Sequence, residues 1–134
     1  MTACYLDASA IVKLATREQE TNALREHVAA YDARVTSRLA TVEVPRALAR
    51  RGSDSVAVGA EPLRAILRTL LLVELDEDVA KRAAELEPAM LRSLDAIHLA
   101  SALVIGDELA AVVTYDARLA SAARAAGLTV LAPA

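Results

Sequence analysis

The stretch Cys4-Tyr5-Leu6-Asp7-Ala8-Ser9 (CYLDAS), near the start of the chain, decides how the rest is interpreted. Its apolar residues predict a buried strand over residues 3–6. The strand ends in Asp7, a carboxylate that is costly to remove from water unless a partner lies beside it. Ser9 is expected to cap a short helix over residues 10–15. The position of Asp7 therefore needs an explanation from elsewhere in the chain.

The composition is that of one domain with an aliphatic core. The chain has 134 residues, 55% of them hydrophobic, and we expect a single domain over residues 1–134. Aromatic residues supply only 2%, as three Tyr, so Ala, Leu, Val and Ile must fill the core. The lone Cys4 excludes a disulfide framework and a cysteine metal site, and is expected to be a small buried strand residue.

Hydropathy and charge limit the expected cellular location and the kinds of partner. No apolar run approaches the roughly 18 residues of a membrane span, and Asp7 interrupts the only early apolar run, so we expect no signal peptide and a cytoplasmic location. A net charge of −3 argues against indiscriminate binding of nucleic acid. Arginine nevertheless dominates the basic residues, and the group at Arg46, Arg50 and Arg51 suits phosphate contacts, although a compositional bias of the genome explains it equally well.

Strands and helices are expected to alternate along the chain. Apolar runs predict strands over residues 3–6, 34–36, 70–75, 111–114 and 128–131. Amphipathic or apolar segments predict helices over residues 10–15, 18–31, 38–51, 62–69, 77–86, 94–105 and 118–126.

Three local features set the expected boundaries. Ser37 is expected to cap the helix that ends near Gly52, and Asp76 or Asp78 the helix that runs to Leu86. Residues 52–62 are the least regular stretch, with Pro62 expected at the first position of the next helix.

Strands separated by helices predict an α/β fold with a central, mainly parallel sheet and helices on both faces. The segments YLDAS and TYDAR both place an aspartate, Asp7 and Asp116, at the end of an apolar strand. Ligands of open parallel sheets bind beyond the carboxyl ends of the strands. Both acids are expected there.

Four acidic residues stand out from the charged helix faces: Asp7, Glu43, Asp95 and Asp116. Each has a structural explanation when it is taken singly. Asp7 could start a turn, Asp95 suits a first helical turn, and Asp116 could cap the last helix. Glu43 could pair with Arg46. Together the four would need four separate explanations, which favours one shared site.

A shared site of carboxylates needs a cation. Two like charges about 5 Å apart repel by roughly 3 kcal/mol at an effective dielectric near 20. Hard oxygen ligands without a His or Cys set suit Mg²⁺, with Mn²⁺ as the alternative ion. Such ions activate water and stabilise a leaving oxygen in phosphoryl transfer, so hydrolysis of a phosphodiester is the expected chemistry.

The sequence resembles the PIN-domain ribonucleases, and within them the VapC-type toxins of toxin–antitoxin pairs. The resemblance rests on four segments in order, YLDASAIVKL, TSRLATVEVPRAL, LRSLDAIHLASAL and VVTYDARLASAARAAGLTVLAP, each of which carries one of the acids. It implies a three-layer α/β/α sandwich. It also implies metal-binding and catalytic positions at Asp7, Glu43, Asp95 and Asp116.

The resemblance extends to neighbouring residues. Ser9 and Thr114 match polar positions that hydrogen-bond the carboxylates. Arg118 follows Asp116 closely and could contact RNA phosphate or form a surface ion pair. His98 lies within the DAIHLA segment, where we expect a packing or hydrogen-bonding role rather than a general base.

The resemblance also implies partners. A VapC-like toxin would cleave cellular RNA, form a homodimer or a larger assembly, and be inhibited by a VapB-like antitoxin. The alternative is a non-catalytic PIN-fold module that binds RNA or protein. A dehalogenase-like phosphatase is disfavoured because Ser9 stands where that class needs a second aspartate, and a receiver domain because the early acidic pair is absent.

Overall fold

The computed structural model describes residues 2–134. The strands are β1 (Ala3–Leu6), β2 (Ala33–Ser37), β3 (Leu71–Val73), β4 (Leu109–Val113) and β5 (Val130–Leu131). The helices are α1 (Ala8–Ala15), α2 (Thr21–Ala29), α3 (Ala40–Arg51), α4 (Ser53–Thr69), α5 (Glu77–Glu85), α6 (Ser93–Leu103) and α7 (Ala117–Ala125), with a 3₁₀ turn at Gly106–Glu108.

The five strands form one sheet in the order β3-β2-β1-β4-β5, and every neighbouring pair is parallel. Cys4 of β1 aligns with Arg34 of β2 on one side and with Ala111 of β4 on the other. The strand order therefore reverses between β1 and β4. The carboxyl ends of these two strands form the switch point at which α/β sheets bind ligands.

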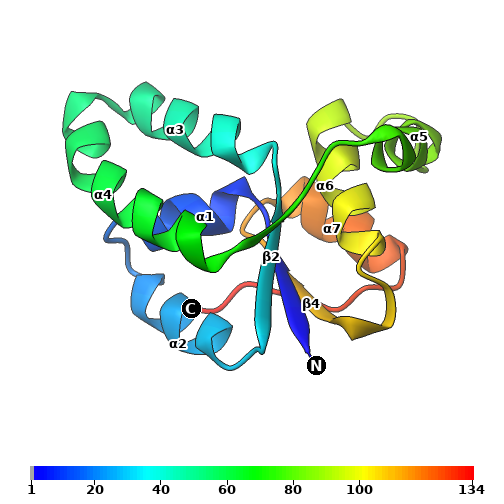
Figure 1. Cartoon of the computed structure of the whole chain (residues 1–134), viewed down its shortest axis with the longest axis horizontal. Helices are drawn as coiled ribbons and strands as arrows, with labels where there is room; N and C mark the ends of the chain where they lie inside the picture. The colour runs from blue at the N-terminus through cyan, green and yellow to red at the C-terminus, as the bar shows by residue number, and fades with distance from the viewer. Residues whose placement is uncertain (1) are drawn as a thin grey trace.

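The sheet is the middle of three layers. Figure 1 shows α1, α3 and α4 on one side of it and α5, α6 and α7 on the other. Leu6 faces the first layer, where it packs with residues of α1 to α4, whereas Tyr5 faces the second layer and packs near Ala102 of α6. The alternation along β1 follows from the two-residue period of a strand. The expected α/β/α sandwich with a parallel sheet is confirmed.

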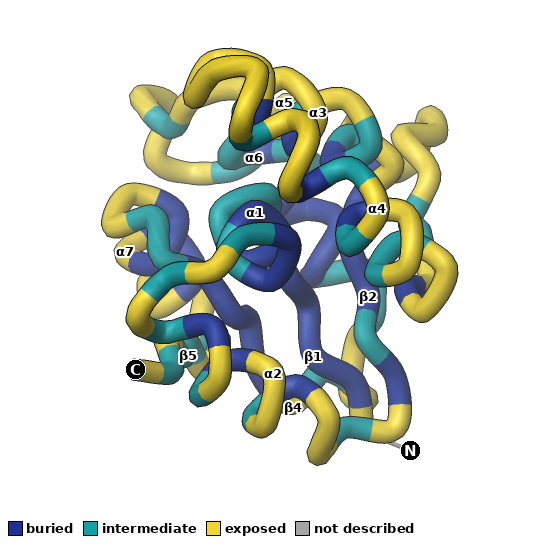
Figure 2. The backbone as a smooth tube through the Cα atoms, turned by 90° about the vertical axis from the view of Figure 1, so that its left-hand side faces the viewer, coloured by how far each residue is buried: buried dark blue, intermediate teal, exposed yellow. Residues whose placement is uncertain are grey.

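The central strand is the most enclosed part of the molecule. All four residues of β1 are buried, as the dark tube through the middle of Figure 2 shows. Burial raises the pKa of the Cys4 thiol to about 11, in keeping with the expected role as a small core residue. None of the helices within residues 2–134 is both long and apolar enough to cross a bilayer.

Two expected helix caps are wrong. Ser9 does not cap the first helix: Asp7 is the cap, its side chain accepts from the backbone N–H of Ala10, and α1 starts at Ala8. A carboxylate caps as well as a hydroxyl does, and it also matches the positive end of the helix dipole. Ser37 lies at the end of β2, and its Oγ accepts from the N–H of Leu39, so α3 starts only at Ala40.

The stretch over residues 52–62 is also not as expected. It is helical, because α4 runs without interruption over Ser53–Thr69 and Pro62 lies inside it. Pro62 leaves the carbonyl of Val58 without a helical partner, but Val58 is exposed, so water can satisfy that carbonyl. Gly59 and Leu63 are buried at helical spacing against the first layer, and this packing outweighs the local signals for a break.

Candidate active site

Asp7 is a buried carboxylate held by three donors. It lies directly after β1, and only 4% of its surface is exposed. Ser9 Oγ donates to Oδ1 at 2.7 Å, the N–H of Ala10 donates to the same oxygen at 3.1 Å, and Thr114 Oγ1 donates to Oδ2 at 2.7 Å. Burial raises the pKa of Asp7 above its ordinary value of 3.8, while these hydrogen bonds act in the opposite direction.

Thr114 connects Asp7 to the second acidic position. It directly follows β4, beside the end of β1, and its Oγ1 accepts from the N–H of Asp116 at 3.0 Å while donating to Asp7. The side chain of Asp116 accepts from the N–H of Arg118 at 2.9 Å and so caps α7. Asp116 therefore fills the structural role of a cap and also lies at the switch point of the sheet.

Asp95 completes a group of three carboxylates. It is the third residue of α6 and is partly buried. Burial raises the pKa of Asp95, and the negative charges of Asp116 and Asp7 raise it further, whereas the positive charge of Arg92 lowers it. The structure thus brings Asp95 within electrostatic range of both Asp7 and Asp116, although the three come from separate segments.

Glu43 belongs to a different hydrogen-bonded chain at the edge of this group. Its Oε1 lies 2.5 Å from Nε2 of His98, and Nδ1 of that imidazole lies 2.6 Å from the hydroxyl of Tyr5. Burial raises the pKa of Tyr5, so its hydroxyl keeps its proton and can donate to Nδ1. His98 then carries its proton on Nε2 and donates it to Glu43.

The sequence predicts only a packing or hydrogen-bonding role for His98, without naming its partners. The buried imidazole links β1, α6 and α3, from Tyr5 through His98 to Glu43. The spacing of Asp95 and His98, three residues apart on one helix, is the sequence signal that places both on the same face. Nothing in the sequence identifies Tyr5 as the other partner.

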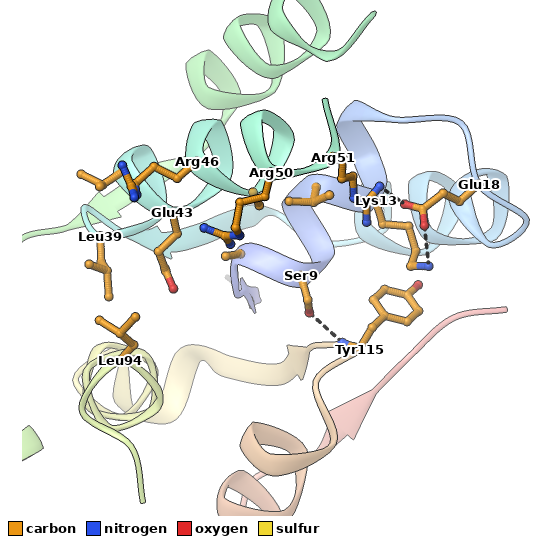
Figure 3. A pocket seen from close by; sticks show the side chains of 14 residues that line it. Ser9, Lys13, Glu18, Leu39, Glu43, Arg46, Arg50, Arg51, Leu94 and Tyr115 are labelled. Carbon is orange, nitrogen blue, oxygen red and sulfur yellow. Dashed lines mark hydrogen bonds and ion pairs between the residues drawn. The ribbon is translucent and has the colours of Figure 1, made fainter. Parts of the chain in front are cut away.

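An open pocket of about 550 Å³ lies beside Glu43. Ser9 of α1 and Glu43 of α3 reach it from two sides, and Figure 3 shows that Arg46 and Arg50 project from the same helix as Glu43. Tyr115 lines the opposite wall, and Lys13 Nζ lies over its ring at 4.6 Å from the ring centre. Arg118 lies outside this pocket and is exposed.

Three of the four acids have the chemistry of ligands for a metal ion. Within residues 2–134 no three His, Cys, Asp or Glu side chains lie close enough together to hold a metal ion as they stand. Their chemistry nevertheless fits a hard cation, because Asp7, Asp95 and Asp116 offer carboxylate oxygens. In the same part of the chain no Lys or Arg forms an ion pair with these three acids.

Comparison with known proteins assigns the family. The family model of the PIN domain matches residues 4–125. The chain belongs to the PIN domain family. It is 46% identical over 133 residues to Ribonuclease VapC46 of Mycobacterium tuberculosis, with 99% of each chain covered. It is 42% identical over 133 residues to Ribonuclease VapC47 of the same species, with 96% of each covered. The expected resemblance to VapC ribonucleases is confirmed.

Solved structures agree with the fold. The crystal structure of VapC20 of M. tuberculosis, described as a sarcin–ricin loop cleaving toxin, superposes with a TM-score of 0.71 at 17% identity, covering 97% of this chain and 99% of that one. VapBC2 of Rickettsia felis, bound to a DNA fragment from its promoter, superposes with a TM-score of 0.72 at 13% identity, covering 98% of both chains. At such low identity the likeness extends to the PIN architecture alone.

Proposed function

We propose that this chain is a single-domain VapC-type toxin, an endoribonuclease that hydrolyses phosphodiester bonds in cellular RNA. Asp7, Asp95, Asp116 and Glu43 are its catalytic residues. One observation carries the proposal: Asp7 and Asp116 follow the two strands of the switch point, burial and the charges of Asp116 and Asp7 raise the pKa of Asp95, and within residues 2–134 no Lys or Arg forms an ion pair with any of the three. The identity to VapC ribonucleases of M. tuberculosis supports the same reaction.

Asp7, Asp95 and Asp116 would hold Mg²⁺ or Mn²⁺, and Glu43 would hold the ion or position water. A bound ion would offset their repulsion, activate a water molecule and stabilise the leaving oxygen.

The other residues of the site orient these carboxylates. Ser9 and Thr114 fix the orientation of the Asp7 carboxylate through one hydrogen bond to each oxygen. His98 holds Oε1 of Glu43, which leaves Oε2 free to accept a hydrogen bond from the attacking water.

We also propose a VapB-like antitoxin as the partner, a homodimer as the smallest toxin assembly, and the cytoplasm as the location. Apolar side chains next to the acids support a protein partner. Val42 and Leu94, both about half exposed, line the pocket beside Glu43. Size-exclusion chromatography with light scattering, on the toxin alone and co-expressed with the product of a neighbouring antitoxin gene, tests both assemblies.

Cleavage of a structured RNA tests the activity. The wild-type chain is expected to cleave it in the presence of Mg²⁺ or Mn²⁺ and to lose this activity with EDTA. Asp7→Asn and Asp95→Asn are each expected to reduce the rate by 100-fold or more, on the order of the loss when a catalytic group is removed. Asp107→Asn, at an exposed carboxylate before β4, is the matched control. Cleavage by both site variants at the control rate would refute the site.

A further inference from the structure

Two pairs of arginines flank the acids on opposite sides. On one side, Glu43, Arg46 and Arg50 follow one another at helical spacing on α3 and line the pocket of about 550 Å³ that also contains Ser9 (Figure 3). On the other side, a second pocket of about 410 Å³ is lined by Arg92 and Arg118. The first pocket also contains Arg51, which forms an ion pair with Glu18 at 3.6 Å, so each pocket holds two guanidinium groups that form no ion pair within residues 2–134.

The acids connect the residues that line the two pockets. Ser9 lines the first pocket and donates a hydrogen bond to Asp7. Asp95 lines the second pocket, and the charge of Asp7 acts on it. Asp7 and Asp95 therefore lie between the side chains of the first pocket and those of the second.

The four arginines have no internal role in the fold. Arg46, Arg50, Arg92 and Arg118 are exposed, and within residues 2–134 their side chains make neither an ion pair nor a hydrogen bond. Other arginines do both: Arg38 forms an ion pair with Glu74 at 2.7 Å, and Arg82 pairs with Asp78 at 3.2 Å. The four flanking guanidinium groups are thus available to a ligand.

A nucleic acid strand has the charge pattern that this arrangement matches. A strand cleaved at the acids carries phosphates on both sides of the bond that breaks, and the carboxylates repel those phosphates. Guanidinium groups bind phosphate in a bidentate manner and offset this repulsion. An acidic peptide would lack the regular spacing of one charge per backbone unit.

We propose that the RNA strand crosses the acids from one pocket to the other, with its phosphates bound by Arg46 and Arg50 on one side and by Arg92 and Arg118 on the other. This path rests on the proposed endoribonuclease function and adds the direction in which the substrate lies. Because the contacts are to phosphate, they carry no base specificity.

Binding measured without cleavage tests the path. The ligand is a fluorescein-labelled oligouridylate of about 12 nucleotides, in EDTA, with affinity followed by fluorescence anisotropy over a range of salt concentrations. Arg46→Ala/Arg50→Ala and Arg92→Ala/Arg118→Ala remove one pair each. The control, Arg64→Ala/Arg68→Ala, removes two exposed arginines from α4 that line neither pocket.

Each flanking double variant is expected to bind more weakly and to lower the slope of log K against log salt by about 1.4, since each phosphate contact on a single strand contributes about 0.7. Arg46→Lys/Arg50→Lys is expected to restore the slope because the charge returns. The control is expected to match the wild type.

A flanking pair whose removal changes the slope no more than the control does would overturn the crossing path. So would displacement of the labelled RNA from the wild type by an acidic peptide at the same concentration as by unlabelled oligouridylate, because the arginines would then not be specific for phosphate. Failure of the proposed function is a separate result: the wild type would bind the oligouridylate but leave RNA uncleaved when metal is added.

Discussion

Asp7 serves two purposes with one side chain. Its Oδ1 caps α1 through the N–H of Ala10, and its buried position places the carboxylate at the switch point between β1 and β4. The cap needs only an oxygen, whereas a metal site needs the charge. Replacing Asp7 by asparagine therefore separates the two, because the cap is kept and the charge is removed.

Asp7→Asn is expected to stabilise the metal-free protein increasingly as pH rises. Burial raises the pKa of Asp7 in the folded protein above the ordinary value of 3.8. The contribution of the protonated carboxyl to the free energy of unfolding is therefore fully present below 3.8 and is lost as pH rises through the pKa of the folded state. Melting temperatures of wild type and variant in EDTA, between about pH 4 and pH 8, measure the difference. The exposed Asp107→Asn is the control, and a difference that does not change with pH would contradict the expectation.

His98 links the core to Glu43. His98→Leu is expected to lower the free energy of unfolding by about 1–3 kcal/mol, because the buried hydroxyl of Tyr5 loses its partner. It is also expected to lower kcat with little change in KM, since Glu43 loses its donor. His98→Gln keeps an N–H that can reach Glu43 and should recover part of the kcat. Urea unfolding and cleavage kinetics give the two readouts, and equal kcat for both variants would argue against positioning.

At the scale of elements, α3 supplies the acidic and basic side chains on one side of the site. Glu43 lies in its first turn, and Arg46 and Arg50 follow on the same face. The helix ends at Gly52, whose φ of 115° and ψ of 171° lie in a region that essentially only glycine occupies. This glycine sets the angle between α3 and α4.

Gly52→Asn is expected to lower the free energy of unfolding by about 1–3 kcal/mol through backbone strain. Gly127→Asn is the matched control: Gly127 has a φ of 86°, in the left-handed region that asparagine tolerates. A Cβ would meet no atom within 4 Å at either position, so side-chain clashes are the same in both variants. Urea denaturation distinguishes them, and equal losses would show that backbone conformation is not the cause.

At the scale of the whole molecule, the acids couple stability to cations. Asp7, Asp95 and Asp116 come from the ends of β1 and β4 and from α6, so a cation that binds them would hold together parts of both sides of the sheet. Binding to the folded chain alone raises its stability by mass action.

Mg²⁺ or Mn²⁺ at about 100 times its dissociation constant is expected to raise stability by about 2.7 kcal/mol and the melting temperature by roughly 10 °C. Asp95→Asn is expected to reduce this shift, and Asp107→Asn to leave it unchanged. Thermal denaturation over a series of metal concentrations measures the effect. Equal shifts in wild type and Asp95→Asn would contradict the assignment of Asp95.

Much of the fold and the acids of the site can be predicted from local pattern. The apolar run before Asp7 predicts β1, and the alternation with helices predicts a parallel sheet, because both depend on residues close in sequence. The rule that parallel strands end at one edge then places Asp7 and Asp116 together. The PIN family follows from the same segments.

The remaining features depend on contacts between distant residues. Pro62 lies inside α4 because packing of Leu63 outweighs the local signal for a break. The bond from His98 to Glu43 spans 55 residues, and the one to Tyr5 spans 93. Local pattern determined which acids the chain carries to the edge of its sheet. Only tertiary structure decided which neighbours hold Glu43 in place, because a hydrogen bond needs two atoms within about 3 Å, and no local rule sets that distance between remote segments.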